Sequence, residues 1–243
     1  ETTADYATGA DEAYIIYTSG TTGRPKGALL NYTNLYYFLI TCTREDSFRF
    51  HRDSVVLHYT SVNFDVSIIE LYNALFNGAA LVVVNEEERK DVKKVYNIIN
   101  ERKVTYMFLP PAVFNLFTEF NFTAMEAACT GGEPMPRSLV ERIVNQPYRF
   151  INCYGPAECT PISSIQDITS VDMYRNFGRA SHYFTYVVVD EQMQPVQPGE
   201  EGELLMGGPQ VFNGYLNRPE LTKEKLIDNP FADTRDKAPK LYL

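Results

Sequence analysis

A short loop near the start of the chain concentrates groups that bind anions. It follows an apolar, β-branched run, Ala13–Tyr17, that predicts a buried strand. In order, the loop residues are Thr18, Ser19, Gly20, Thr21, Thr22, Gly23, Arg24, Pro25, Lys26 and Gly27. Glycines let the backbone turn N–H groups toward a ligand, hydroxyls add donors, and the lysine adds a positive charge. This composition predicts a site for a phosphate chain, with a flexible surface loop as the alternative.

The loop differs from a Walker-type P-loop. That motif places a Gly-Lys-Ser/Thr triplet at the start of a helix. Here Pro25 precedes Lys26 and Gly27 follows it, so the triplet is missing. Any phosphate would therefore be held by a different arrangement of backbone and side-chain donors.

Two further loops with ligand-binding residues follow predicted parallel strands. The first is Asn152–Glu158, where Tyr154 offers a ring for a purine, Asn152 can bond the edge of that purine, and Glu158 offers oxygens for Mg²⁺. The second, Thr130–Pro134, offers backbone amides before a helix. Open α/β sheets bind ligands at the carboxyl ends of their strands, so both loops are nucleotide-site candidates. A Gly-Pro turn with an incidental carboxylate is the alternative for the first loop.

Asp65 is the acidic residue that bears on substrate class. It lies in the stretch Asn63–Ser67, directly before a predicted helix. A carboxylate there stabilises the helix dipole by roughly 0.3–1 kcal/mol. The same carboxylate can instead pair with a substrate ammonium in a poorly solvated pocket. Only the second interpretation requires a substrate that carries an amine.

Together these motifs resemble the adenylate-forming superfamily of acyl-CoA synthetases, luciferases and adenylation domains of nonribosomal peptide synthetases. The glycine-rich loop is similar to its phosphate-binding signature, and Tyr154–Glu158 is similar to its YGPTE motif, with Ala157 in place of threonine. Phe64–Glu70 resembles the FDxSxxE stretch of amino-acid-activating domains. Gly202–Leu216 resembles a later motif, GELxxxGxxVxxGYL, which we interpret as strand-and-turn scaffolding.

The resemblance implies a role for each matching residue. Tyr154 would stack on adenine, Glu158 would hold Mg²⁺, and Asp65 would bind the α-amino group. The candidate catalytic residues, which would neutralise charge on the pyrophosphate side, are Lys26, Thr21 and Thr22. The candidate nucleotide-binding residues are Thr18, Ser19, Gly20, Gly23, Gly131, Gly132, Glu133, Pro134, Asn152, Tyr154 and Gly155. The candidate lining of the substrate side-chain pocket is Val66, Ile69, Phe108, Cys129, Gly131, Cys153, Pro161 and Ile162, which favours an uncharged side chain.

The function implied by the resemblance is ATP- and Mg²⁺-dependent activation of an amino acid as aminoacyl-AMP. In the family, the aminoacyl group then passes to a phosphopantetheinyl carrier protein, and a small C-terminal subdomain supplies a further lysine. The last strand stops at Leu243 without a turn, so we expect a fragment of a longer protein, with little activity alone. The alternatives are an acyl- or aryl-CoA ligase, against which Asp65 argues, and an inactive nucleotide-binding fragment.

The elements that must position these residues alternate between strands and helices up to about residue 160. The predicted strands are Ser54–Tyr59, Ala79–Val84, Thr105–Leu109, Ala127–Thr130 and Arg149–Cys153. The predicted helices are Asn34–Thr43 with Thr33 as N-cap, Ser67–Asn77 with a capping box at Ser67–Glu70, a charged helix around Val92–Ile99, Ala112–Phe120 and Pro136–Asn145. This order predicts an α/β fold, with a parallel sheet covered by helices on both faces.

Beyond Thr160 the pattern becomes short strands separated by turns, which predicts a smaller β-rich subdomain. The predicted strands there are Ile162–Ile168, Tyr183–Val189, Gly202–Met206 and Lys240–Leu243. We therefore expect two domains, residues 1–160 and residues 161–243.

Composition narrows the class of partner. The net charge of −9 argues against nucleic acid or an anionic membrane as the main partner. The sequence shows neither an apolar run long enough for a membrane span nor a signal peptide. Four scattered cysteines fit buried thiols in a reducing cytoplasm better than a zinc site or disulfides. The expected location is cytoplasmic.

Overall fold

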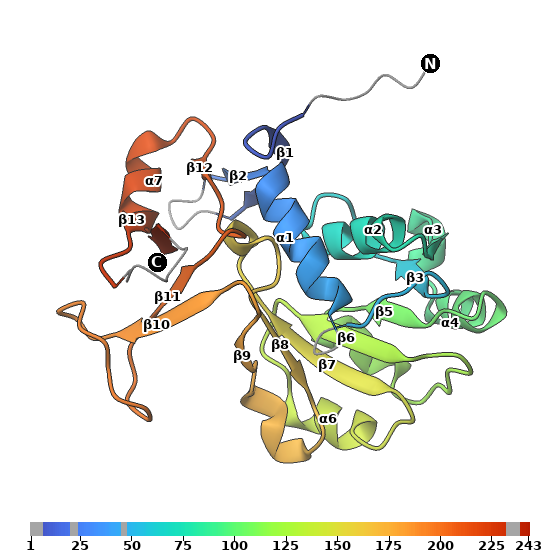
Figure 1. The fold of residues 1–243 in the computed structure, drawn as a ribbon. Helices are drawn as coiled ribbons and strands as arrows, with labels where there is room; N and C mark the ends of the chain where they lie inside the picture. The colour runs from blue at the N-terminus through green and yellow to red at the C-terminus, as the bar shows by residue number, and fades with distance from the viewer. Residues whose placement is uncertain (1–6, 20–23, 45–47, 232–238) are drawn as a thin grey trace. The chain divides into compact units, whose positions relative to one another are not determined.

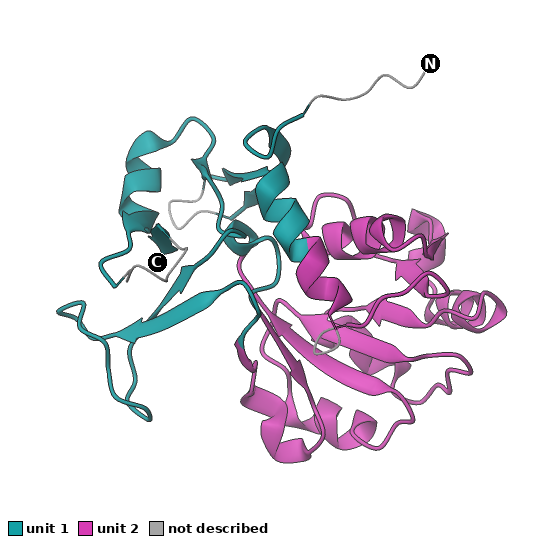
Figure 2. Ribbon diagram, viewed as in Figure 1, with its two compact units in different colours: residues 1–38, 157–163, 180–243 teal, residues 39–156, 164–179 magenta. Residues whose placement is uncertain are grey.

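The computed structural model describes residues 7–19, 24–44, 48–231 and 239–243, which fall into two compact units (Figure 2). Unit 1 comprises residues 1–38, 157–163 and 180–243, and unit 2 comprises residues 39–156 and 164–179. This division differs from the expected single boundary near residue 160. The two units interleave along the chain because the first strands pair with a strand close to the end.

Unit 2 is built on a seven-stranded sheet with the order β4-β3-β5-β6-β7-β8-β9 (Figure 1). Its strands are β3 (Val55–His58), β4 (Ala80–Val83), β5 (Tyr106–Phe108), β6 (Ala127–Gly131), β7 (Arg149–Tyr154), β8 (Ser164–Asp167) and β9 (Arg179–Ala180). The pairs from β4 to β7 are parallel, whereas β8 runs antiparallel to β7. The prediction of a mainly parallel sheet is confirmed.

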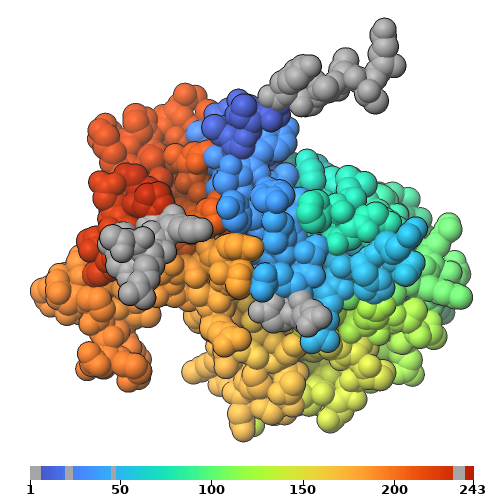
Figure 3. Space-filling model, viewed as in Figure 1, coloured from blue at the N-terminus to red at the C-terminus, as the bar shows by residue number. Residues whose placement is uncertain are grey.

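Helices cover both faces of this sheet. They are α2 (Val66–Phe76), α3 (Glu86–Arg89), α4 (Val92–Glu101), α5 (Pro111–Phe114) and α6 (Arg137–Ile143). On one face, Met107 and Phe150 share a buried cluster with residues of α4, α5 and α6. On the other face, Val56 and Phe108 lie beside Ile69 of α2. The residues of α2 to α4, cyan to green in Figure 3, form part of the visible surface.

Unit 1 contains two antiparallel sheets. The smaller has the order β1-β2-β12, from β1 (Glu12–Thr18), β2 (Lys26–Asn31) and β12 (Gly214–Tyr215). The larger has the order β10-β11-β14-β13, from β10 (Thr185–Val189), β11 (Glu203–Gly207), β14 (Lys240–Tyr242) and β13 (Leu226–Asp228). A buried cluster joins Leu30, Phe212 and Tyr215 of this unit. The prediction of a β-rich part is confirmed.

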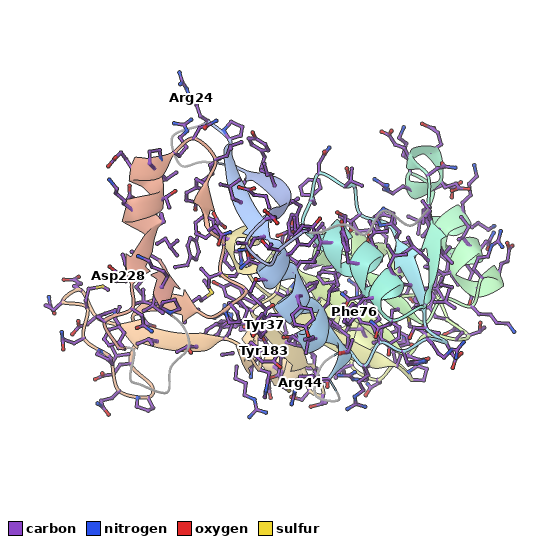
Figure 4. The ribbon with its side chains drawn as sticks, turned by 45° about the horizontal axis from the view of Figure 1, so that its top comes forward. Arg24, Tyr37, Arg44, Phe76, Tyr183 and Asp228 are labelled. Atoms are coloured by element: carbon purple, nitrogen blue, oxygen red, sulfur yellow. The ribbon has the colours of Figure 1, made fainter. Side chains whose placement is uncertain are left out.

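Two helices complete the chain. Helix α1 (Tyr32–Thr43) begins in unit 1 and ends in unit 2, and α7 (Pro219–Lys225) lies in unit 1. In unit 1, the rings of Tyr37 on α1 and Tyr183 meet edge to face with centroids 5.0 Å apart (Figure 4). Within the described residues, no helix combines the length and apolarity needed to cross a membrane.

Several elements differ from expectation. Strand β1 is only partly buried: Ile16 is covered, but Ile15 and Tyr17, on the opposite face of the strand, are 40% and 60% exposed. Strand β2 and helix α7 were not anticipated. The segment Ile162–Ile168 contributes β8 to the large sheet instead of to the β-rich part. The helix expected over Ala112–Phe120 ends early, and a 3-10 turn follows it.

Both predicted helix caps are wrong. Helix α1 is capped by Asn31, because Asn31 and Asn34 exchange side-chain–backbone hydrogen bonds of 2.8 and 2.9 Å. Thr33 instead donates its hydroxyl to the carbonyl of Gly9. In α2 the N-cap position belongs to Asp65, whose side chain makes no capping bond, and Glu70 is buried in other contacts.

We expect Asn31→Ala to destabilise the protein by about 1 kcal/mol, because a helix N-terminal donor would lose its acceptor. The thermal midpoint should fall by about 2–4 °C. Thr33→Ala is the matched control, and it should cost less than about 0.5 kcal/mol because it removes one exposed hydrogen bond. A larger loss in Thr33→Ala than in Asn31→Ala, measured by thermal unfolding, would contradict this cap assignment.

Candidate functional site

A cleft in unit 2 lies at the carboxyl ends of β6 and β7 and has a volume of about 680 Å³. This falls within the usual size of small-molecule sites. Its lining residues are Gly132, Glu133, Pro134, Met135, Pro136, Asn152, Cys153, Tyr154, Gly155, Pro156, Tyr174, Arg175 and Phe177. The structure therefore brings together both loops that were predicted to follow parallel strands.

Two glycines shape one side of this cleft for different reasons. A Cβ at Gly131 would collide with the backbone carbonyl of Cys153, so β6 and β7 can approach closely only without a side chain there. Gly132 has φ of +80°, a conformation that L side chains rarely adopt. A substitution at Gly132 would change the wall of the cleft, and one at Gly131 would disturb the β6–β7 pair behind it.

Aromatic rings form the other side. The rings of Tyr154 and Phe177 lie with centroids 4.6 Å apart and planes inclined by 36°. Tyr154 remains 37% exposed, so one part of its ring is available to a flat ligand. Asn152 is nearly buried, and its amide donates to the carbonyl of Asn176 at 2.9 Å, which fixes the orientation of the amide.

Of the lining residues that sequence reasoning missed, Tyr174, Arg175 and Phe177 lie furthest along the chain from the two predicted loops. They come from a 3-10 turn, Val171–Arg175, and the segment that follows it. The only local signal was the aromatic content of this turn before Gly178. Placing the turn at the cleft required knowing that β8 pairs with β7.

A second cluster of polar residues is buried in unit 1. Lys26 Nζ lies 3.0 Å from Glu158 Oε1 and donates to the hydroxyl of Tyr215 at 2.7 Å. That hydroxyl donates in turn to Glu158 Oε1 at 2.5 Å. The side chain of Glu158 is 4% exposed and that of Lys26 is 18% exposed. A buried carboxylate of this kind is stable only with such partners.

The tyrosine hydroxyls in this cluster stay protonated. Burial, together with the bond to Glu158, raises the pKa of Tyr215 far above its ordinary value. Burial and the charge of Glu158 also raise the pKa of Tyr242. Tyr215 therefore acts as a neutral donor toward the carboxylate.

The carboxylate of Glu158 has the chemistry of a magnesium ligand, but its Oε1 is paired with Lys26 in this structure. Mg²⁺ is commonly held by one or two carboxylates together with substrate phosphates and water. Among the described residues, no group of three or more His, Cys, Asp or Glu side chains could form a metal site alone. A single carboxylate fits Mg²⁺ that arrives with phosphates, once Lys26 has moved off Oε1.

The predicted phosphate loop connects β1 to β2 as a hairpin. Thr18 and Lys26, at its two ends, are cross-strand neighbours, and Ser19 is exposed. Arg24 points outward in Figure 4. The predicted residues that lie outside the described part of the chain are Gly20, Thr21, Thr22 and Gly23.

The predicted substrate-pocket residues are distributed over both units. Asp65 and Val66 are half-buried at the start of α2. Ile69, Phe108 and Cys129 line one small cavity of unit 2, with room for about 10 Å³. The remaining predicted members of unit 2 are Gly131 and Cys153, and those of unit 1 are the buried Pro161 and Ile162.

Two of the buried thiols, those of Cys42 and Cys153, stay protonated. All four cysteines of the chain are free and buried. Burial raises the pKa of Cys42 and Cys153 well above the ordinary thiol value, and Cys129 adds to the shift of Cys153. Protonated thiols are poor nucleophiles and poor metal ligands, so their contribution here is shape and polarisability.

Glu70 ties the start of α2 to the end of β3. Its carboxylate lies 2.8 Å from His58 Nδ1 and accepts from both the backbone N–H and the hydroxyl of Thr60. Its side chain is only 1% exposed. These bonds span the loop that carries Asp65, so they hold both ends of that loop.

A family model described as "AMP-binding enzyme" matches residues 2–216. The chain belongs to the AMP-binding enzyme family. Tyrocidine synthase 1 of Brevibacillus parabrevis is 33% identical over 228 residues, which cover 91% of this chain and 20% of that protein. Gramicidin S synthase 1 of Brevibacillus brevis is 33% identical over 227 residues, which cover 91% of this chain and 20% of that protein. The chain thus spans about a fifth of the length of these two relatives.

Solved structures agree with this membership. The N-terminal subdomain of Klebsiella oxytoca NpsA, in complex with 3-hydroxybenzoyl-AMSN, matches with a TM-score of 0.82 and 26% identity, over 97% of this chain and 58% of that chain. A four-domain nonribosomal peptide synthetase bound to AMP and glycine matches with a TM-score of 0.83 and 29% identity, over 96% of this chain and 17% of that chain. The fold of this AMP-binding family member is that of an adenylation-domain N-terminal subdomain.

Tyr154→Ala should weaken adenine-nucleotide binding about 5- to 150-fold, the range that corresponds to a stacking contribution of ~1–3 kcal/mol. Tyr154→Phe keeps the ring and should bind within about two-fold of the unchanged protein. Calorimetric titration with AMP measures both variants. Equal affinity in Tyr154→Ala and the unchanged protein would exclude stacking at this residue.

The Glu70 contacts allow a comparison of two histidine–glutamate pairs. Glu70→Ala should cost about 2–4 kcal/mol of unfolding free energy, because it leaves buried donors without an acceptor. His51→Ala removes the pair with Glu126, whose side chains are 47% and 44% exposed, and should cost less than about 1 kcal/mol. Urea unfolding measures both variants. Equal losses of unfolding free energy would contradict the larger contribution that we assign to the buried pair.

Proposed function

We propose that this chain activates an amino acid with ATP, forming aminoacyl-AMP and pyrophosphate. The main support for nucleotide binding is the cleft at the ends of β6 and β7, where the exposed ring of Tyr154 and Gly132 both line the wall. Support for the peptide-synthetase branch comes from the relatives, which include tyrocidine and gramicidin S synthases. Support for an amino acid comes from Asp65 at the start of α2.

In this proposal the cleft binds the adenosine part of ATP. Tyr154 stacks against adenine, while Asn152 and the turn at Gly132–Pro134 provide polar groups at the edge of the base. Lys26 and the loop hydroxyls, including Thr21 and Thr22, neutralise the charge of the phosphates. Glu158 would hold Mg²⁺, which would supply further charge neutralisation.

The reaction is a displacement at phosphorus. A carboxylate oxygen of the amino acid attacks the α-phosphorus of ATP, and the bond from that phosphorus to the bridging oxygen breaks. Both bonding electrons leave with pyrophosphate. The contribution of the chain is to align the carboxylate with the α-phosphorus and to compensate charge on the leaving group, which accounts for most catalysis in phosphoryl-type transfers.

Asp65 supplies specificity for an amine in this scheme. The substrate ammonium pairs with its carboxylate, and the uncharged residues Val66, Ile69, Phe108 and Cys129 favour an uncharged side chain. The structure of the NpsA subdomain with a 3-hydroxybenzoyl analogue supports a second candidate, an aromatic acid without an α-amine. The two candidates differ in whether Asp65 has a charged partner.

A carrier protein with a phosphopantetheine arm is the proposed acceptor of the acyl group. Support comes from a solved adenylation–PCP di-domain from Klebsiella oxytoca, artificially fused, which matches with a TM-score of 0.83 and 25% identity over 97% of this chain and 48% of that chain. The catalytically inactive alternative predicts nucleotide binding without pyrophosphate exchange.

We expect Asp65→Asn in the full-length protein to lower amino-acid-dependent ATP–pyrophosphate exchange by about 10- to 100-fold, because a charge-assisted contact to the ammonium is lost. A des-amino analogue of the same acid should lose far less, since it carries no ammonium. A panel of amino acids and aromatic acids, run first on the unchanged protein, selects the substrate.

Asp91→Asn is the matched control. Asp91 is also an acid at a helix N-terminus, and its side chain caps α4 through the N–H groups of Lys93 and Lys94. The rate of ATP–pyrophosphate exchange in Asp91→Asn should equal that of the unchanged protein. If Asp65→Asn lowered activity equally with and without the substrate amine, the role of Asp65 would be to stabilise the fold. That result would favour an aromatic acid as the substrate.

A further inference from the structure

Tyr215 occupies the centre of the buried cluster in unit 1. It is 3% exposed, and its hydroxyl accepts from Lys26 Nζ while donating to Glu158 Oε1. The ammonium of Lys26 also lies 4.4 Å from the centre of the tyrosine ring. A single hydroxyl therefore contacts the lysine of the glycine-rich loop and the carboxylate with magnesium-ligand chemistry.

Backbone bonds fix the position of this tyrosine on both sides. Tyr215 pairs with Ala28 in the β2–β12 ladder, and the N–H of Leu216 donates to the carbonyl of Gly27 at 2.8 Å, next to Lys26. The N–H of Phe212 donates to the carbonyl of Glu158 at 2.8 Å. The segment 212–216 thus connects the backbones that carry Lys26 and Glu158.

We propose that Tyr215 is a positioning residue that holds Glu158 ready for a metal-bound nucleotide. This proposal rests on the proposed function. When phosphates draw Lys26 away from Glu158, the hydroxyl of Tyr215 keeps its bond to the carboxylate and prevents it from rotating. The buried carboxylate then keeps the Tyr215 donor, beside the hydroxyl of Tyr242, throughout the exchange of lysine for metal.

Packing alone is the competing explanation for Tyr215. Its ring lies 4.7 Å from that of Phe212 and belongs to the buried cluster of unit 1. Phenylalanine keeps these ring contacts but can neither donate to Glu158 nor accept from Lys26. Tyr215→Phe therefore separates the hydroxyl from the packing.

The test compares ATP binding with Mg²⁺ and with EDTA, by calorimetric titration of the full-length protein. In Tyr215→Phe we expect the affinity for ATP with Mg²⁺ to fall about 10- to 100-fold, and that for metal-free ATP to change less than about two-fold. Tyr186→Phe is the matched control, because its hydroxyl lies 2.6 Å from Ser163 Oγ and its ring packs against the same cluster. Both affinities should be unchanged in that variant.

The outcomes separate this proposal from the proposed function. If the unchanged protein does not bind ATP, both fail. If it binds ATP but Tyr215→Phe loses both affinities equally, or neither, the positioning role is wrong while the function stands. Should Tyr215→Phe fail to fold, Lys26→Met tests whether Lys26 is the residue that orients Glu158. That variant should keep its preference for ATP with Mg²⁺, and loss of the preference would mean that Lys26, instead of Tyr215, orients Glu158.

Discussion

A buried carboxylate imposes the strongest constraint on unit 1. Glu158 is almost completely removed from solvent, and desolvating its charge is costly unless opposite charge and donors surround it. Lys26 and Tyr215 meet that need from β2 and β12, which are far apart in sequence but adjacent in the small sheet. The pairing of β2 with β12 is thus coupled to the ion pair between Lys26 and Glu158.

Unit 2 obeys a different constraint, the geometry of parallel strands. The carboxyl ends of β6 and β7 meet at one edge, and the missing side chain of Gly131 lets them approach. The loops that leave this edge line the cleft with aromatic and polar groups, while Glu70 holds the neighbouring loop at both ends. The paired strands form the scaffold, and the proposed site lies in the loops that follow them.

Sequence reasoning succeeded where the signal was local. Continuous apolar runs predicted the parallel strands, and the loops around Gly132 and Tyr154, which the sequence placed after such strands, line one cleft. It failed where contacts join distant segments. Tyr215 looked like scaffolding because only the fold brings it to Lys26. The cap prediction at Thr33 was wrong because the helix begins one residue earlier, at Tyr32, which makes Asn31 the N-cap. The roles of the individual site residues remain predictions.

A substrate carboxylate that attacks the α-phosphorus of ATP leaves one of its oxygens in AMP, so isotope transfer tests the proposed reaction most directly. The full-length protein would be given the substrate found in the exchange panel, labelled with ¹⁸O in its carboxylate. After the acyl group has passed to a thiol, mass spectrometry should find one labelled oxygen in AMP and none in pyrophosphate. Label in ADP, inorganic phosphate or pyrophosphate, or unlabelled AMP, would contradict the account.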